Sequence, residues 1–135
     1  MKKSPLLFII ILFIASCQPD EDKNFTATRD TYLGIWHAEL YKNGAFDVAF
    51  ELEILAHPSE SNKILIDDFN QFGKGIRAVA TISNTSVDIP QQNVSGYITS
   101  GFGTLKNQGN LLDLKYNVDD QAGQPPEDYS ATLTK

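Results

Sequence analysis

Apolar and polar side chains alternate along most of the chain after residue 30, and this period of two constrains the fold more than any other feature. The clearest run places five apolar residues at every second position: Phe46, Val48, Phe50, Leu52 and Ile54. Successive side chains of a β-strand point to opposite faces of a sheet, so the run predicts a strand with one buried face. Asn43-Gly44, just before it, is typical of a two-residue hairpin turn because both residues tolerate a positive φ.

Further short segments of the same kind are separated by turn residues: 33–41, 63–69, 76–83, 86–89, 93–105, 111–118 and 129–134. Pro90 should end the strand 86–89, because proline has no N–H to donate to a sheet ladder. No convincing helical pattern is found in 31–135. We therefore predict an all-β fold, a single antiparallel up-and-down meander of seven or eight strands curled into a small barrel. A two-sheet β-sandwich is the alternative.

The beginning of the chain has the features of an export signal. Two lysines precede ten uncharged, mostly apolar residues, Leu6 to Ala15, a stretch too short to cross a membrane as a helix. Small residues follow, and Ile14-Ala15-Ser16-Cys17 resembles the lipobox at which bacterial lipoprotein precursors are cut before the cysteine. We predict that residues 1–16 are a lipoprotein signal peptide. Cys17 then becomes the N-terminus and carries acyl chains such as palmitate, which anchor the protein to a membrane.

The residues after the cysteine are polar and acidic, so 17–30 should form a flexible tether that carries the lipidated Cys17, with the β-domain at 31–135. The acidic cluster close behind the cysteine resembles the surface-export signal of Bacteroidota-type lipoproteins. We expect the protein in the outer membrane, lipid-anchored and exposed on the cell surface, with the periplasmic leaflet as the alternative.

Charge and composition argue against several classes of function. The chain has 17 acidic and 11 basic side chains and a net charge of −6, which argues against a nucleic-acid partner. The same charge argues against adhesion to anionic lipid, so membrane contact should come from the lipid anchor. Cys17 is the single cysteine, which excludes thiol catalysis and cysteine-ligated zinc in the domain. Nucleophile-elbow, phosphate-loop and nucleotide motifs are missing too, so we expect no cofactor, no catalytic residue and no enzyme activity.

The metal-ligating residue types are sparse. The hairpin register places His37 opposite a residue near 50, far from His57, so the two histidines should not share a metal. Carboxylates at both ends of the loop from Asp119 to Asp128 could supply oxygen ligands to calcium, although the spacing of a known calcium loop is absent. We expect no metal site elsewhere, and calcium binding at this loop stays open.

Five residues are predicted to face a ligand or to fill the barrel core: Trp36, Phe46, Phe50, Asp68 and Tyr116. Asp68 has the parity of Ile64 and Ile66 and so should point inward, where a structural role at the strand end is favoured over catalysis. Phe72 lies in the turn Gln71-Phe72-Gly73. It is either an exposed contact residue on a loop or an apolar side chain that closes the barrel end.

Leu33-Gly34-Ile35-Trp36 resembles the Gly-x-Trp opening of lipocalin-like barrels. The wider layout of 31–135 resembles short, mostly uncharacterised Bacteroidota-type outer-membrane lipoproteins with a lipocalin-like domain. That resemblance implies the fold and the anchor but no activity. On these grounds we expect a non-catalytic binding module for a small apolar or amphipathic ligand. The alternative is a structural or accessory subunit that binds a protein partner in an outer-membrane complex, and an enzyme is less favoured. A hollow barrel would favour a ligand and a filled one a protein partner.

Overall fold

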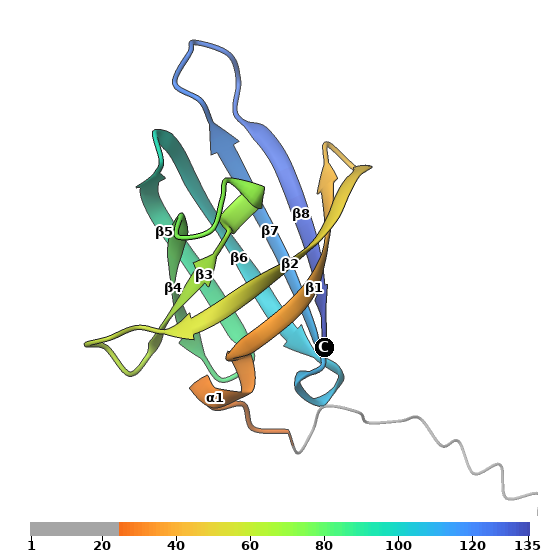
Figure 1. Ribbon diagram of the computed structural model, residues 1–135, viewed down its shortest axis with the longest axis vertical. Helices are drawn as coiled ribbons and strands as arrows, with labels where there is room; N and C mark the ends of the chain where they lie inside the picture. Colours follow the sequence, from red (N-terminus) through yellow and green to blue (C-terminus); the bar gives the residue numbers. More distant parts are fainter. Residues whose placement is uncertain (1–24) are drawn as a thin grey trace, which may run out of the picture.

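The structure, a computed structural model, describes residues 25–135 (Figure 1). The predicted signal peptide 1–16, Cys17 and residues 18–24 of the predicted tether lie outside this range. The elements in chain order are α1 (Arg29–Tyr32), β1 (Gly34–Lys42), β2 (Ala45–Ala56), β3 (Lys63–Asp67), the 3-10 turn η1 (Phe69–Gln71), β4 (Arg77–Ser83), β5 (Ser86–Val94), β6 (Tyr97–Lys106), the 3-10 turn η2 (Asn107–Gly109), β7 (Leu111–Asp119) and β8 (Glu127–Thr134).

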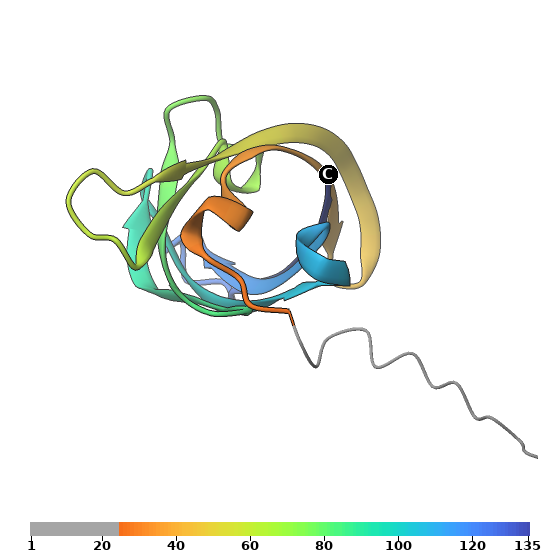
Figure 2. The ribbon, with the colours of Figure 1, turned by 90° about the horizontal axis from the view of Figure 1, so that it is seen from below.

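The strands form one closed, antiparallel barrel in which each strand pairs with its neighbours in the sequence. β8 returns to β1, with Ala38 opposite Leu133 and Leu40 opposite Ala131, so the sheet closes on itself. Seen along its axis, the molecule is a ring of strands (Figure 2). The predicted up-and-down, lipocalin-like barrel is confirmed with eight strands, and the sandwich alternative is wrong.

The first hairpin contains the predicted turn and one irregularity that the sequence pattern does not show. Asn43 (φ 49°) and Gly44 (φ 82°) form the two-residue turn. Leu40 pairs with Val48 but Tyr41 pairs with Phe46, so one extra residue of β2 forms a bulge. Between the bulge and the turn, the side chains of β2 therefore point to the face opposite to the one that alternation predicts.

The prediction that Phe46 faces the core or a ligand is therefore wrong. Its side chain is 59 % exposed on the outside of the barrel, where it makes an edge-to-face contact with Tyr41 at 5.8 Å between ring centroids. The inward face of β2 carries Val48, Phe50 and Leu52, with Leu52 buried and Phe50 half-buried against the core.

β5 and β6 also differ from the sequence prediction. The predicted strands 86–89 and 93–105 become 86–94 and 97–106, divided by a turn at Ser95-Gly96. Pro90 does not end β5. The backbone register of β4 and β5 runs from Ser83↔Ser86 to Thr81↔Asp88, and its extension places Val79 opposite Pro90, which has no N–H. The side-chain amide of Gln92 pairs with the backbone of Val79 instead. Its Oε1 accepts from the Val79 N–H and its Nε2 donates to the Val79 carbonyl, both at 2.8 Å.

Two inward-facing glycines allow β6 and β7 to approach closely. A Cβ at Gly101 would lie 2.5 Å from the Cβ of Tyr116, and one at Gly103 would lie 2.6 Å from the carbonyl oxygen of Asp113. Larger residues would force the strands apart at these points. The glycines thus leave the interior space that the side chains of Leu114 and Tyr116 occupy.

α1 lies at one end of the barrel (Figures 1 and 2), which we call the closed end because buried side chains fill it. Trp36 is fully buried there, and its Nε1 donates to the carbonyl of Tyr32 at 2.8 Å. The ammonium of Lys135 lies 4.6 Å from the Trp36 ring centroid and donates to the carbonyls of Thr31 and Leu33. Burial lowers the pKa of Lys135. The packed domain also includes residues before the predicted boundary at 31, because Ala27 is buried and its N–H donates to Asn84 Oδ1 at 2.8 Å.

Candidate ligand sites at the barrel mouth and on its outer face

The opposite end of the barrel, the mouth, is hollow. A cavity of about 280 Å³ lies between η1, the β5–β6 hairpin and the loop that joins β7 to β8. Its lining consists of Asn70, Phe72, Tyr97, Val118, Asp120, Gln124, Pro125, Glu127 and Tyr129. The barrel below it is filled by side chains that are less than 2 % exposed, among them Ile54, Ile66, Phe69, Ile89 and Leu112. The mouth cavity is therefore a cup above a core of buried side chains.

Three aromatic residues line this cup, Phe72, Tyr97 and Tyr129, and the rings of Tyr116 and Phe69 pack next to them. Phe72 and Tyr97 stack with their planes 14° apart and their centroids 4.6 Å apart. Tyr116 and Tyr129 are nearly parallel at 5.8 Å, and Phe69 lies 4.7 Å from Tyr116. Phe72 is half-buried and packs against the core. Of its two predicted roles, this contact supports the one in which Phe72 closes the barrel end.

The polar groups of the mouth are held by one another. Tyr116 donates its hydroxyl to Asn70 Oδ1 at 2.8 Å, and Tyr129 donates to Glu127 Oε2 at 3.3 Å. Glu127 also pairs with Lys42 at 2.9 Å. Burial raises the pKa of both Tyr116 and Tyr129, and the hydrogen bond with Glu127 raises the pKa of Lys42. The phenols therefore stay protonated and the ammonium charged at neutral pH.

The turn η1 has an unusual backbone. Asp68, Asn70 and Gln71 all have left-handed φ values, 54°, 52° and 60°, in a region that costs a residue with a side chain about 1 kcal/mol. Asp68 Oδ1 accepts from the Gly73 N–H at 2.8 Å, and Gln71 N–H donates to the carbonyl of Asp68 at 3.0 Å. These bonds hold the strained turn in the shape that places Asn70 and Phe72 at the mouth.

Asp68 is therefore not the inward-facing side chain that strand parity predicts. β3 ends at Asp67, and the left-handed conformation of Asp68 breaks the alternation. Its carboxylate supports the turn, in agreement with the favoured structural role. Asp68 also borders a smaller hollow of about 180 Å³ between β2 and β3, together with Ile35, Glu51, Leu52, Glu53, Asp67 and Lys74.

The other predicted residues do not share one site. Trp36 fills the closed end and Tyr116 lies beneath the mouth, so both are core residues. Tyr97, Tyr129 and Glu127, which sequence reasoning missed, line the mouth itself. Tyr129 alternates with Ala131 and Leu133, as an inward-facing residue of β8 should, but nothing in the sequence places it at the open end.

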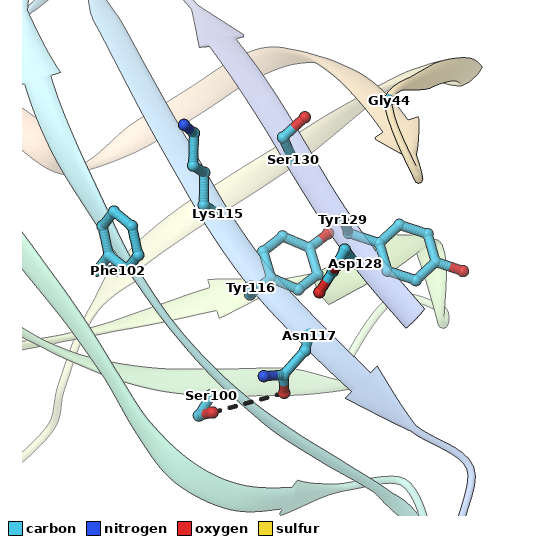
Figure 3. A pocket seen from close by; sticks show the side chains of 9 residues that line it. All are labelled: Gly44, Ser100, Phe102, Lys115, Tyr116, Asn117, Asp128, Tyr129 and Ser130. Carbon is cyan, nitrogen blue, oxygen red and sulfur yellow. Dashed lines mark hydrogen bonds between the residues drawn. The ribbon is translucent and has the colours of Figure 1, made fainter. Parts of the chain in front are cut away.

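A second hollow, of about 390 Å³, lies on the outer face of the barrel (Figure 3). We call it the outer groove. It is lined by Gly44, Ser100, Phe102, Lys115, Tyr116, Asn117, Asp128, Tyr129 and Ser130, from β6, β7, β8 and the first hairpin. Phe102 is 61 % exposed at one side of it. Ser100 Oγ and Asn117 Oδ1 lie 3.5 Å apart across neighbouring strands.

Within residues 25–135, no three His, Cys, Asp or Glu side chains are grouped closely enough to hold a metal ion. His37 faces outward opposite Glu51, and His57 lies beyond the end of β2, where its Nδ1 accepts from the Glu60 N–H at 3.1 Å. In the loop considered for calcium, Asp119 and Asp120 accept the N–H groups of Gln121 and Ala122 at 2.8 and 2.9 Å. Those carboxylates stabilise the turn itself.

Across the same described range, no helix combines the length and hydrophobicity that crossing a membrane requires. Compared with known proteins, the chain matches no family model and no curated protein at a significant level.

Proposed function

We propose that the protein is a lipid-anchored, non-catalytic binding module that holds a small amphipathic ligand at the barrel mouth. The anchor is acylated Cys17, which places the domain at the outer membrane. The cell surface is the favoured side and the periplasmic leaflet the alternative. A filled interior by itself favours a protein partner over a ligand, so one observation carries the binding proposal: the cavity at the open end of the barrel joins aromatic walls to polar groups.

The size and lining of the mouth define the ligand. At about 280 Å³ the cavity approaches the lower end of ordinary ligand sites, about 300 Å³, so it suits a molecule with one or two small ring systems rather than a long acyl chain. An apolar ring would lie against Phe72 and Tyr97, and a polar group would reach Gln124 or the carboxylate of Glu127. A wholly apolar ligand would take water from the amide of Gln124 and from the oxygen lone pairs of Glu127 that Lys42 and Tyr129 do not use, which costs binding energy.

A fluorescence titration with N-phenyl-1-naphthylamine, a neutral amine that joins one phenyl and one naphthyl ring system, tests the proposal. Tyr97→Ala removes one wall and should raise the Kd about tenfold, the equivalent of losing a stacked aromatic contact. Gln124→Trp should block the cavity from an exposed loop position without removing a core contact. Phe46→Ala, an aromatic deletion on the outside, is the matched control. A titration without a fluorescence gain, or equal binding by all four proteins, would refute the proposal.

A specific feature also favours the second candidate, a subunit that binds a protein partner. Three large apolar side chains are exposed on the outside of the barrel: Ile35, Phe46 and Phe102, at 64, 59 and 61 %. β2 also pairs with β3 only from Ile54 to Ala56, so its residues 45–53 have one free edge. An edge of this kind is able to accept another strand. Cross-linking in cells followed by recovery of the full chain tests this candidate, and recovery of the bait alone would count against it.

A further inference from the structure

The outer groove lies on the opposite face of the sheet from the core, on three adjacent strands. The register of β6, β7 and β8 arranges its outward side chains in two rows: Ser100–Asn117–Asp128 and Phe102–Lys115–Ser130. All six line the hollow (Figure 3). Because they stand on paired strands, their relative positions are fixed by backbone hydrogen bonds rather than by a loop.

The charged groups of the groove are not used by the fold. Lys42, Lys63, Arg77 and Lys106 each form an ion pair with a carboxylate. By contrast, in the part of the chain that the structure describes, the side chains of Lys115 and Asp128 make no hydrogen bond or ion pair. In Figure 3 their charged ends point in different directions within the same hollow. One strong donor and one strong acceptor are thus free to meet a ligand.

The aromatic side chain is also not used for packing. Phe102 lies between Gly101 and Gly103, opposite Asp88 on one side and Lys115 on the other. No aromatic residue stacks on it within residues 25–135, and it remains 61 % exposed. Its ring therefore presents an apolar surface beside a row of polar groups.

This combination selects one ligand chemistry. A purely apolar ligand would bury Lys115 and Asp128 without partners, which is costly. A polyanion would meet Asp128 and a polycation would meet Lys115, so neither strongly charged class fits. A neutral sugar ring has an apolar C–H face that packs on an aromatic ring and a rim of hydroxyls that both donate and accept hydrogen bonds. We propose that the outer groove binds a neutral saccharide, with one ring on Phe102 and its hydroxyls bonded to Lys115, Asn117 and Asp128.

The groove is open and shallow, so a Kd of about 1 mM is expected for a short oligosaccharide. The test uses the full chain in a non-glycosidic detergent, with cellohexaose, mannohexaose and xylohexaose as probes and saturation-transfer NMR as the readout. At least one probe should bind. Phe102→Ala should raise its Kd about tenfold, whereas Phe102→Trp should preserve or tighten binding because it keeps the aromatic face.

Two controls separate this site from other effects. Ile35→Ala deletes a side chain of similar exposure that does not line the groove, so saccharide binding should not change. N-phenyl-1-naphthylamine binding at the mouth should not change in Phe102→Ala, which also reports that the variant is folded. The inference is overturned if none of the three hexasaccharides binds, or if Phe102→Ala binds as the wild type does.

Discussion

The side chain of Gln92 is predicted to hold two strands together where a proline interrupts their ladder. Gln92→Ala removes an acceptor for the Val79 N–H and a donor to the Val79 carbonyl, each at 2.8 Å and partly buried. A hydrogen bond of this kind contributes about 1 kcal/mol net, so the variant should lose about 2 kcal/mol of unfolding free energy. For a domain of this size the loss corresponds to a fall in Tm of about 8 °C.

Urea denaturation followed by tryptophan fluorescence measures this loss, because Trp36 is buried in the core. With a slope of about 1.5 kcal/mol/M, the midpoint should fall by about 1.3 M. Gln91→Ala is the matched control, since Gln91 is exposed and adjacent, and it should change stability by less than about 0.5 kcal/mol. Adding Pro90→Ala to Gln92→Ala restores a backbone N–H opposite Val79 and should recover part of the loss.

The reasoning is refuted if Gln92→Ala is no less stable than Gln91→Ala. If the losses of unfolding free energy in Pro90→Ala and Gln92→Ala simply add in the double variant, the amide of Gln92 does not replace the missing backbone donor.

Four further predictions follow from other parts of the molecule. Gly103→Ala should destabilise the barrel by about 2 kcal/mol or more in urea, because the new methyl would lie 2.6 Å from a carbonyl oxygen of β7. Tyr116→Phe should cost about 1 kcal/mol by the same assay, since it removes the hydroxyl bond to Asn70. Burial raises the pKa of the Tyr32 phenol to about 12. The protonated side chain should therefore contribute its full stability below pH 10 and lose it as the pH rises toward 12. In an alkaline denaturation series, Tyr32→Phe should lose less stability over that pH range than the wild type. Cys17→Ser should move the protein from the membrane fraction to the soluble fraction, and its retention in the membrane would contradict the proposed anchor.

The architecture followed from the sequence because alternation, glycine turns and short strands act locally. The Asn43-Gly44 turn and the alternation at 111–118 needed no knowledge of the rest of the chain. Errors arose where one residue changed the register. The bulge in β2 turned Phe46 outward, and no pattern in the alternation marks the position of a bulge.

Other features depended on partners far away in the sequence. Pro90 has the local signature of a strand end, but Gln92 reaches across to Val79 and allows the strand to continue. The position of Asn70 at the mouth depends on the left-handed turn η1 and on the hydroxyl of Tyr116, 46 residues away. The candidate site could not be predicted because its members come from η1, the β5–β6 hairpin and the final loop. Those segments meet only when the barrel closes.

The central claim, that the barrel mouth binds a small amphipathic molecule, is tested most directly by NMR chemical-shift mapping with N-phenyl-1-naphthylamine on the isotope-labelled full chain. The perturbed amides should cluster at Asn70, Phe72, Tyr97 and Glu127, while Trp36 at the closed end should stay unchanged. Shifts confined to other parts of the barrel, or none at saturating probe, would contradict it.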